Sequence, residues 1–400
     1  QFYHVSIDHS GKNQDLIVGG MQDNSSYKTE STNNNEAWVY LLGGDGMYSA
    51  VGDSGNAIAA SWQNGGTKLI EPTWRTLIPL GSSGAQWSNP IVINPAENKM
   101  LYYVGGTTLW RIEDMVTTGN SVYSNSSWYN DGYEQMTQTN KGNTIGNLGL
   151  STTNPQHLLY YATNGGGVYK VANANTGDNA PTDISPTGAP VGAWPNSIQV
   201  NPEDGNEVLL TYSNYEVISV WHTSDGGTTW TNVGGNLESN ADGSGAGPSV
   251  RWGIILPYNS QKYYLLGTSV GVYSTSLLNG SSTVWGLEGA NTIGNVLVDA
   301  LAGRASDGLV VAGTHGRGVF SANFGGNSDV TAPTVQTLSP ADEATGVGAN
   351  EDLVITMDEN LSTGTGNITI YNSNESVFEQ IDITGSKVTV SNTVVTINPD

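Results

Sequence analysis

The stretch Ile91-Val-Ile-Asn-Pro95, continued by Leu101-Tyr-Tyr-Val-Gly-Gly106 and Leu109-Trp-Arg111, sets the pattern of this chain. A short apolar segment meets an Asn-Pro turn. A second apolar segment ends in small residues, and a third carries an aromatic side chain. Apolar, β-branched and aromatic runs bounded by Gly, Asn and Pro are typical of strands joined by turns. The stretch therefore predicts a small antiparallel sheet.

The same pattern recurs throughout the first 325 residues. Clear copies occupy 148–170, 198–212, 254–274 and 296–321, and weaker ones occupy 5–20 and 48–60. Seven units result, spaced by roughly 43 to 57 residues, which is the size of a four-stranded propeller blade. A β-sandwich does not repeat at this period, and a parallel β-helix repeats at about half of it or less. The repeat predicts a seven-bladed β-propeller over 1–325, with one fully apolar strand of each blade near the hub.

Composition agrees with an all-β protein and excludes several functions. Hydrophobic residues make up 37% and charged residues 12%, while 52 Gly and 11 Trp indicate many turns around aromatic packing. The formal charge of −23 leaves no basic surface for nucleic acid and disfavours an anionic membrane, although it is compatible with structural Ca²⁺. No cysteine is present, which excludes disulfides and thiolate chemistry. No apolar run is long enough for a transmembrane helix, so we expect no membrane insertion.

One short motif, Thr223-Ser-Asp-Gly-Gly-Thr-Thr-Trp230, has a clear physical interpretation. Asp225 is expected to accept hydrogen bonds from turn amides, and Gly227 to supply a positive φ angle. Trp230 is expected to pack between neighbouring blades, with Thr223 opening the motif. The motif resembles the Asp-box hairpin of sialidase-like, sortilin-like and xyloglucanase-like propellers, in which its role is structural. Asn279-Gly280 before Trp285 and Asn64-Gly-Gly66 look like eroded versions of the same turn.

Three further segments carry this resemblance: Gly19-Gly-Met-Gln-Asp-Asn24, Gly43-Gly-Asp-Gly-Met-Tyr48 and Thr314-His-Gly-Arg-Gly-Val-Phe320. They are similar to the GGxQDN, GGDG and THGRGV segments of bacterial BNR/Asp-box exoproteins. Together they cover about 2–324. The resemblance implies a secreted or cell-surface bacterial protein, of a type often found in Bacteroidota.

The composition shifts after residue 325, and 326–333 resembles a short linker. Period-2 alternation at 335–340, 353–357, 366–370, 388–390 and from 394 onward predicts a β-sandwich. The segment 334–400 resembles the bacterial immunoglobulin-like modules of surface proteins. Those modules continue through two more strands, so we expect the module to be incomplete and the chain to be part of a longer polypeptide.

Two acidic residues are weak candidates for catalysis. Asp23 and Asp45 lie in the segments that carry the resemblance, and xyloglucanase-like propellers use a pair of carboxyls, which inverting glycosidases hold apart to admit a water molecule. The simpler interpretation, which we favour, is that both residues form turns. A sialidase would need an arginine triad in a characteristic sequence context, which is missing here.

Polar and aromatic residues supply the remaining candidates. His315 and Arg317 are expected near the ring closure, where they meet Gln22 or Asp23. We favour a salt bridge that locks the ring over a polar ligand pocket with Gln22 and Asn24. Candidates for stacking on a sugar are Trp62, Trp87, Trp194 and Trp252, with blade packing as the alternative for each. The remaining histidines, including His4 and His222, are expected at surface or hairpin positions without metal-ligand spacing.

Three functions remain open. The first is a non-catalytic secreted or surface module that binds glycans or proteins and needs no cofactor beyond a possible structural Ca²⁺. The second is a glycoside hydrolase acting on polysaccharide. The third is a structural subunit that assembles with other surface proteins.

Overall fold

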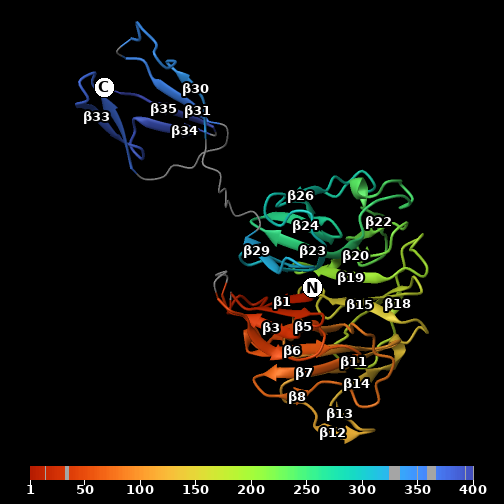
Figure 1. Ribbon diagram of the computed structural model, residues 1–400. Coiled ribbons are helices and arrows are strands. Elements are labelled where there is room, and N and C mark those ends of the chain that lie inside the picture. The colour runs from red at the N-terminus through yellow and green to blue at the C-terminus, as the bar shows by residue number, and fades with distance from the viewer. Residues whose placement is uncertain are drawn as a thin grey trace. The chain divides into compact units, whose positions relative to one another are not determined.

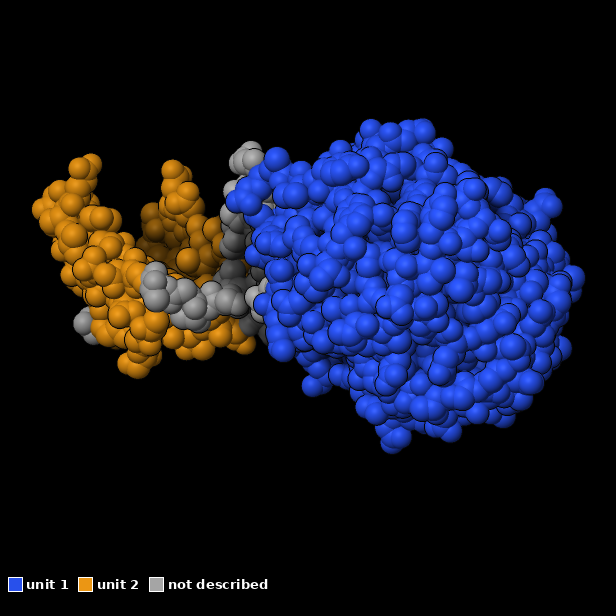
Figure 2. All heavy atoms as spheres, turned by 90° about the horizontal axis from the view of Figure 1, so that it is seen from below, with its two compact units in different colours: residues 1–326 blue, residues 327–400 orange. Residues whose placement is uncertain are grey.

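The computed structural model describes residues 1–13, 15–31, 36–323, 334–348, 350–357, 366–391 and 393–399. The chain divides into two compact units, Gln1–Gly326 and Asn327–Asp400 (Figures 1 and 2). In the described residues, the regular structure consists of strands and three 3-10 turns: η1 (Asp53–Gly55), η2 (Thr137–Thr139) and η3 (Gly235–Leu237). This confirms the prediction of an all-β protein. The expected linker at 326–333 lies outside the described residues.

The first unit begins with four antiparallel sheets that follow one another in chain order. The first sheet contains β1 (Phe2–Ile7), β2 (Ile17–Met21), β3 (Ser26–Thr29) and β4 (Val39–Leu42). The second contains β5 (Gly46–Gly52), β6 (Ala57–Trp62), β7 (Gly66–Glu71) and β8 (Arg75–Thr76). The third contains β9 (Ile91–Ile93), β10 (Leu101–Gly105), β11 (Thr108–Ile112) and β14 (Glu134–Met136). The fourth contains β15 (Ile145–Leu150), β16 (Leu159–Thr163), β17 (Val168–Val171) and β18 (Thr182–Asp183).

Three more sheets complete the first unit among the described residues. The fifth contains β19 (Pro195–Asn201), β20 (Asp204–Tyr212), β21 (Val220–Thr223) and β22 (Thr231–Asn232). The sixth contains β23 (Val250–Tyr258), β24 (Gln261–Thr268), β25 (Gly271–Thr275) and β26 (Gly286–Glu288). The seventh contains β27 (Val298–Arg304), β28 (Leu309–Thr314) and β29 (Val319–Asn323). A separate hairpin of β12 (Ser121–Ser124) and β13 (Ser127–Asn130) is inserted between β11 and β14.

The second strand of each sheet explains the continuous apolar runs in the sequence. Every residue of β10, β16 and β28 is buried, and β6 is buried up to its last residue. A strand needs apolar side chains on both faces when other elements cover both. The runs therefore mark strands that have neighbouring sheets on either side.

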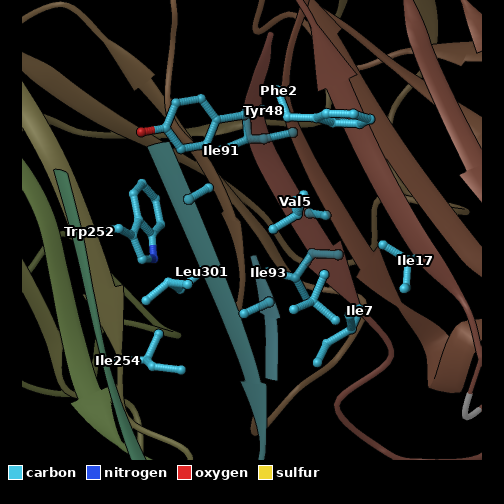
Figure 3. Close-up of a cluster of buried hydrophobic side chains, with 14 of the residues drawn as sticks. Phe2, Val5, Ile7, Ile17, Tyr48, Ile91, Ile93, Trp252, Ile254 and Leu301 are labelled. Atoms are coloured by element: carbon cyan, nitrogen blue, oxygen red, sulfur yellow. The ribbon is translucent and has the colours of Figure 1, made fainter. Parts of the chain in front are cut away.

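The first strands of all seven sheets line a single cavity of about 510 Å³. They are β1, β5, β9, β15, β19, β23 and β27, and each stands at one edge of its sheet. The last of them, β27, packs against β1, so that strands from the two ends of the unit lie side by side. Apolar side chains from five of them, β1, β5, β9, β23 and β27, belong to the largest hydrophobic cluster among the described residues (Figure 3).

A buried carboxylate joins the fifth and sixth sheets. Glu207 on β20 has a side chain only 3% exposed and accepts hydrogen bonds from Lys262 and Tyr264 on β24, both at 2.6 Å. It also accepts one from Asn201 at 2.6 Å and lies 3.0 Å from Nε2 of His222. Since every donor converges on one acid, removal of the acid would leave several buried polar groups without a partner.

The second unit contains two sheets among its described residues. One orders β30 (Val335–Ser339), β31 (Leu353–Met357), β35 (Val394–Ile397) and β34 (Val388–Ser391), and the other pairs β32 (Asn367–Tyr371) with β33 (Val377–Asp382). The sequence did not predict β33, because its strand mixes Glu379 and Asp382 with apolar residues. Only Ile381 of this strand is fully buried.

Candidate functional site

Asp225 organises the turn between β21 and β22. Its carboxylate accepts hydrogen bonds from the Thr229 backbone N–H at 2.9 Å, the Thr229 hydroxyl at 2.7 Å and the Thr223 hydroxyl at 2.8 Å. Gly226 and Gly227 have φ angles of 69° and 86°, which residues with a Cβ rarely adopt. The bonds from Thr229 hold the pKa of Asp225 down at about 2. The carboxylate is therefore used within its own turn.

Trp230 and Trp285 make equivalent contacts one sheet apart. The indole N–H of Trp230, just before β22, donates to the backbone carbonyl of Ile184 beyond β18, at 2.6 Å. The indole N–H of Trp285, just before β26, donates to the backbone carbonyl of Val233 beyond β22, at 2.9 Å. Each tryptophan thus joins the fourth strand of its sheet to the preceding sheet through a hydrogen bond.

The two turns expected to be eroded copies of the Asp225 turn, at Asn279 and at Asn64, occupy different places in their sheets. Asn279 and Gly280 lie between the third and fourth strands of their sheet, as Asp225 does, and Thr283 closes the turn through its hydroxyl. Asn64 lies instead between β6 and β7, the second and third strands. The predicted equivalence of Asn64-Gly-Gly66 is therefore wrong, because any hairpin turn with positive φ selects Asn and Gly.

Asp23 and Asp45 lie together, in adjacent turns. The Asp45 carboxylate accepts a hydrogen bond from the Asp23 backbone N–H at 2.8 Å, and Asp23 has a φ of 58°. The Asp45 backbone N–H donates to the Gln63 side chain at 2.9 Å. These contacts agree with the interpretation that both acids form turns. The Asp23 side chain nevertheless stays exposed, which leaves it accessible.

An aromatic pair stands beside these turns. The rings of Tyr3 and Trp87 meet edge to face, with centroids 5.5 Å apart and planes at 89°. The Tyr3 hydroxyl donates to the Gln22 side chain at 2.5 Å. Trp87 is 42% exposed, which leaves part of its ring accessible from solvent.

Asp299 on β27 is a neighbouring carboxyl that the sequence did not reveal. It is 9% exposed and accepts a hydrogen bond from the Gln1 side chain at 3.3 Å. Burial raises the pKa of Asp299 above its usual value, while the charges of Arg251 and His315 oppose the rise. Burial raises the pKa of Tyr3 as well, and the charges of Asp299, Asp45 and Asp23 raise it further. We call this group the Asp45 face, defined as Gln1, Tyr3, Gln22, Asp23, Asp45, Trp87 and Asp299.

The expected salt bridge at the ring closure is not formed. Arg317 instead donates to the Ile293 backbone carbonyl at 2.6 Å and lies over the Phe320 ring, 5.6 Å from its centroid. The first and seventh sheets are joined by Gln1 with Asp299, and by Arg304, which donates to the Asp8 backbone carbonyl at 3.0 Å. The prediction for Arg317 is wrong because its guanidinium group donates to the Ile293 carbonyl, which lies between β26 and β27. His315 is exposed and lies near Asp299, where it lowers the pKa of that carboxyl.

The remaining candidate binding residues, three tryptophans and Asn24, differ in how much of each side chain is exposed to solvent. Trp252 is 6% exposed, so its ring is not available at the surface. Trp62 is half-buried against the backbone of Gly66, where a Cβ would lie 1.9 Å from the indole. Trp194 is also half-buried. Asn24 is exposed and donates to the Gln22 backbone carbonyl at 3.1 Å, so it helps to close its own turn.

Two histidines occupy interior positions, contrary to the expectation from sequence. His4 is 9% exposed, because it lies on β1 against Tyr48, and His222 lies against Glu207. In the part of the chain that the structure describes, no group of three or more His, Cys, Asp or Glu side chains gathers as metal ligands would. Structural Ca²⁺ remains a prediction from charge.

Comparison with known proteins identifies the second unit. Residues 329–400 match the family model of a bacterial Ig-like domain, which confirms the predicted immunoglobulin-like module. No curated protein matches the chain. Among the described residues, no helix has the length and apolar character needed to cross a membrane.

Proposed function

We propose that residues 1–326 form a seven-bladed β-propeller of the BNR/Asp-box type, in a secreted or cell-surface protein. Support comes from the seven successive sheets, whose first strands line one cavity, and from the tryptophan contacts between successive outer edges. The Asp225 turn adds the local chemistry of an Asp-box. The Ig-like domain is a further module of the same polypeptide.

The propeller module binds glycans through the Asp45 face without cleaving them. The observation that carries this proposal is the exposed Trp87 ring packed against Tyr3, whose hydroxyl bonds to Gln22 and which also feels the charges of Asp23 and Asp45. A sugar ring presents an apolar C–H face, which an aromatic ring covers well, and hydroxyls, which donate to carboxylates in short, charge-assisted hydrogen bonds. Both kinds of partner meet on this face.

The test is a glycan array followed by calorimetric titration of the best ligand. Trp87→Ala is expected to weaken binding by about 1–2 kcal/mol, roughly five- to thirtyfold in Kd. Trp74→Ala is the matched control, since Trp74 is 57% exposed but lies between β7 and β8, outside the face. A Trp87→Ala protein that binds like wild type would contradict the assignment of the face. An array with no bound glycan would favour a structural role in a surface assembly.

Glycoside hydrolysis is the second candidate, and Asp299 favours it. A buried carboxyl with a raised pKa near a second carboxyl group is the arrangement of a general acid with its partner. If the face is catalytic, wild type releases reducing sugar from a polysaccharide panel. Asp299→Asn and Asp45→Asn then each lower the rate by at least about a hundredfold. Binding without any release of sugar would exclude this function for the ligand bound.

A further inference from the structure

Three aromatic rings gather at one end of the cavity between the seven first strands. His4, Tyr48 and Trp252 meet there from three different sheets, with ring centroids 4.5 Å apart for His4 and Tyr48 and 5.4 Å apart for His4 and Trp252. The Tyr48 hydroxyl accepts a hydrogen bond from Asn147 of a fourth sheet at 2.9 Å. All four residues are buried. They form one contact group in the lining of the cavity, which we call the aromatic plug.

The opposite end of the cavity reaches the surface. Its lining there includes Ser10 and Ser306, which are exposed, and Ser54 and Thr152, which are partly exposed. These residues follow the ends of the first strands, whereas the aromatic plug lies near their beginnings. The Asp45 face is formed by residues at the beginnings of the strands, so the cavity opens away from it.

The walls between the two ends are mainly apolar, with Ser6, Ser49 and Gln199 among the polar residues of the lining. Figure 3 shows Tyr48 and Trp252 at one end of the cluster, with Ile93, Ile254 and Leu301 further along. No Lys or Arg lines the cavity in the described part of the chain, and Asp8 is the acidic residue of the lining. The Asp8 carboxylate is already held by the Ser10 hydroxyl and by backbone N–H groups. Apart from the His9 ring, the described lining offers no cationic side chain that would hold an anionic ligand.

The aromatic plug presents a free hydrogen-bond donor to the cavity. The Ser49 backbone N–H donates to Nδ1 of His4 at 3.3 Å, so Nδ1 carries no proton and the neutral ring carries its proton on Nε2. Burial lowers the pKa of His4 to about 3, which keeps the ring neutral at pH 7. Among the described residues, Nε2 of His4 has no acceptor. The indole N–H of Trp252 is likewise buried without a partner in the described structure.

We propose that this cavity binds a small, uncharged, mainly apolar molecule whose single hydrogen-bond acceptor meets the N–H of His4. The volume lies in the range of small-molecule pockets, about 300–1,000 Å³, and a mainly apolar wall with a few polar groups is their usual chemistry. An acceptor at the plug gives the His4 N–H a partner and lies beside Trp252, whose buried indole N–H has none among the described residues. The site is independent of glycan binding at the Asp45 face.

The test is displacement of the uncharged fluorescent dye N-phenyl-1-naphthylamine from the full chain. Benzophenone and diphenylmethane differ only in the carbonyl group of benzophenone. Benzophenone is therefore expected to displace the dye at an about fivefold lower concentration, the difference in affinity that one neutral hydrogen bond supplies. Diphenylacetate, which is anionic at pH 7, is expected not to displace it. In His4→Phe the two neutral ligands become equal while dye binding persists.

Ala302→Phe fills the cavity from β27, because Ala302 belongs to its lining, and is expected to abolish dye binding. Ala172→Phe adds the same side chain at an exposed position and keeps dye binding. If Ala302→Phe loses its cooperative urea transition, Ala50→Phe fills the cavity from β5 instead. The proposal is overturned if wild type shows no saturable dye binding, if folded cavity-filling variants bind as wild type does, or if benzophenone and diphenylmethane compete equally in wild type.

Discussion

Replacing Trp285 by Ala is expected to lower the free energy of unfolding by about 3–5 kcal/mol. Trp285 is 2% exposed and packs in the cluster shared by the fifth and sixth sheets. The substitution removes the ring and leaves a cavity, and it also leaves the buried carbonyl of Val233 without its donor. Urea denaturation followed by tryptophan fluorescence and far-UV circular dichroism measures the change.

Two further variants separate the causes of that loss. Trp285→Phe keeps most of the ring but removes the indole N–H, so it is expected to cost about 1–2 kcal/mol. Trp230→Ala removes the equivalent contact where the ring is only half-buried, so its cost is expected to be smaller than that of Trp285→Ala. Equal costs for Trp230→Ala and Trp285→Ala would contradict the view that burial sets the difference.

Replacing Glu207 by Ala is expected to destabilise the protein by about 3–5 kcal/mol. The side chains of Asn201 and Tyr264 are almost fully buried, so they lose their acceptor where water cannot replace it. Lys262 is 41% exposed and can return to solvent, so its share of the loss is small. Glu203→Ala is the control, since Glu203 is exposed nearby and its loss is expected to change stability by less than about 0.5 kcal/mol.

The contribution of Glu207 is expected to depend on pH. Burial by itself raises the pKa of Glu207, but the hydrogen bonds from His222, Lys262, Tyr264 and Asn201 outweigh it and lower the pKa to about 2. The folded-state pKa is thus below the unfolded value of about 4.3. The stabilisation is therefore complete above about pH 4.3 and is lost as the pH falls towards 2.

Glu207→Gln provides the measurement, because glutamine does not titrate. The difference in unfolding free energy between wild type and Glu207→Gln is expected to be constant from pH 7 to about pH 5 and to shrink below that. A difference that stays constant down to pH 2.5 would show that the carboxylate is not specifically stabilised in the folded state.

The sequence alone indicated the repeat because burial on two faces leaves a readable pattern. A strand such as Leu101–Gly105 must be apolar throughout when sheets cover both sides, and so the seven units were visible without coordinates. Turn chemistry was equally local. The Asp225 turn is closed by residues within four positions of the acid. The eight-residue segment 223–230 was therefore enough to predict that Asp225 bonds within its own turn.

Local similarity was also the source of errors. Asn64-Gly-Gly66 has the composition of the Asp225 turn but joins a different pair of strands, since positive φ selects the same residues in any hairpin. Strand β33 was missed because Glu379 and Asp382 break the apolar pattern on a strand with one fully buried residue. Arg317 was expected to pair with an acid, yet the Ile293 carbonyl is its partner.

What the sequence determined by itself was an all-β chain with seven repeated units, an Ig-like second unit and a structural turn at Asp225. These features depend on contacts between neighbours in sequence or on a regular alternation, which a single chain records directly. The tertiary structure decided the rest. The charges of Asp299 and Asp45 around Tyr3, the hydrogen bond of Lys262 to Glu207, and the packing of His4 in the aromatic plug all depend on residues from different sheets. Their burial and their pKa values arise only when distant strands come together, and no spacing in the sequence encodes that proximity.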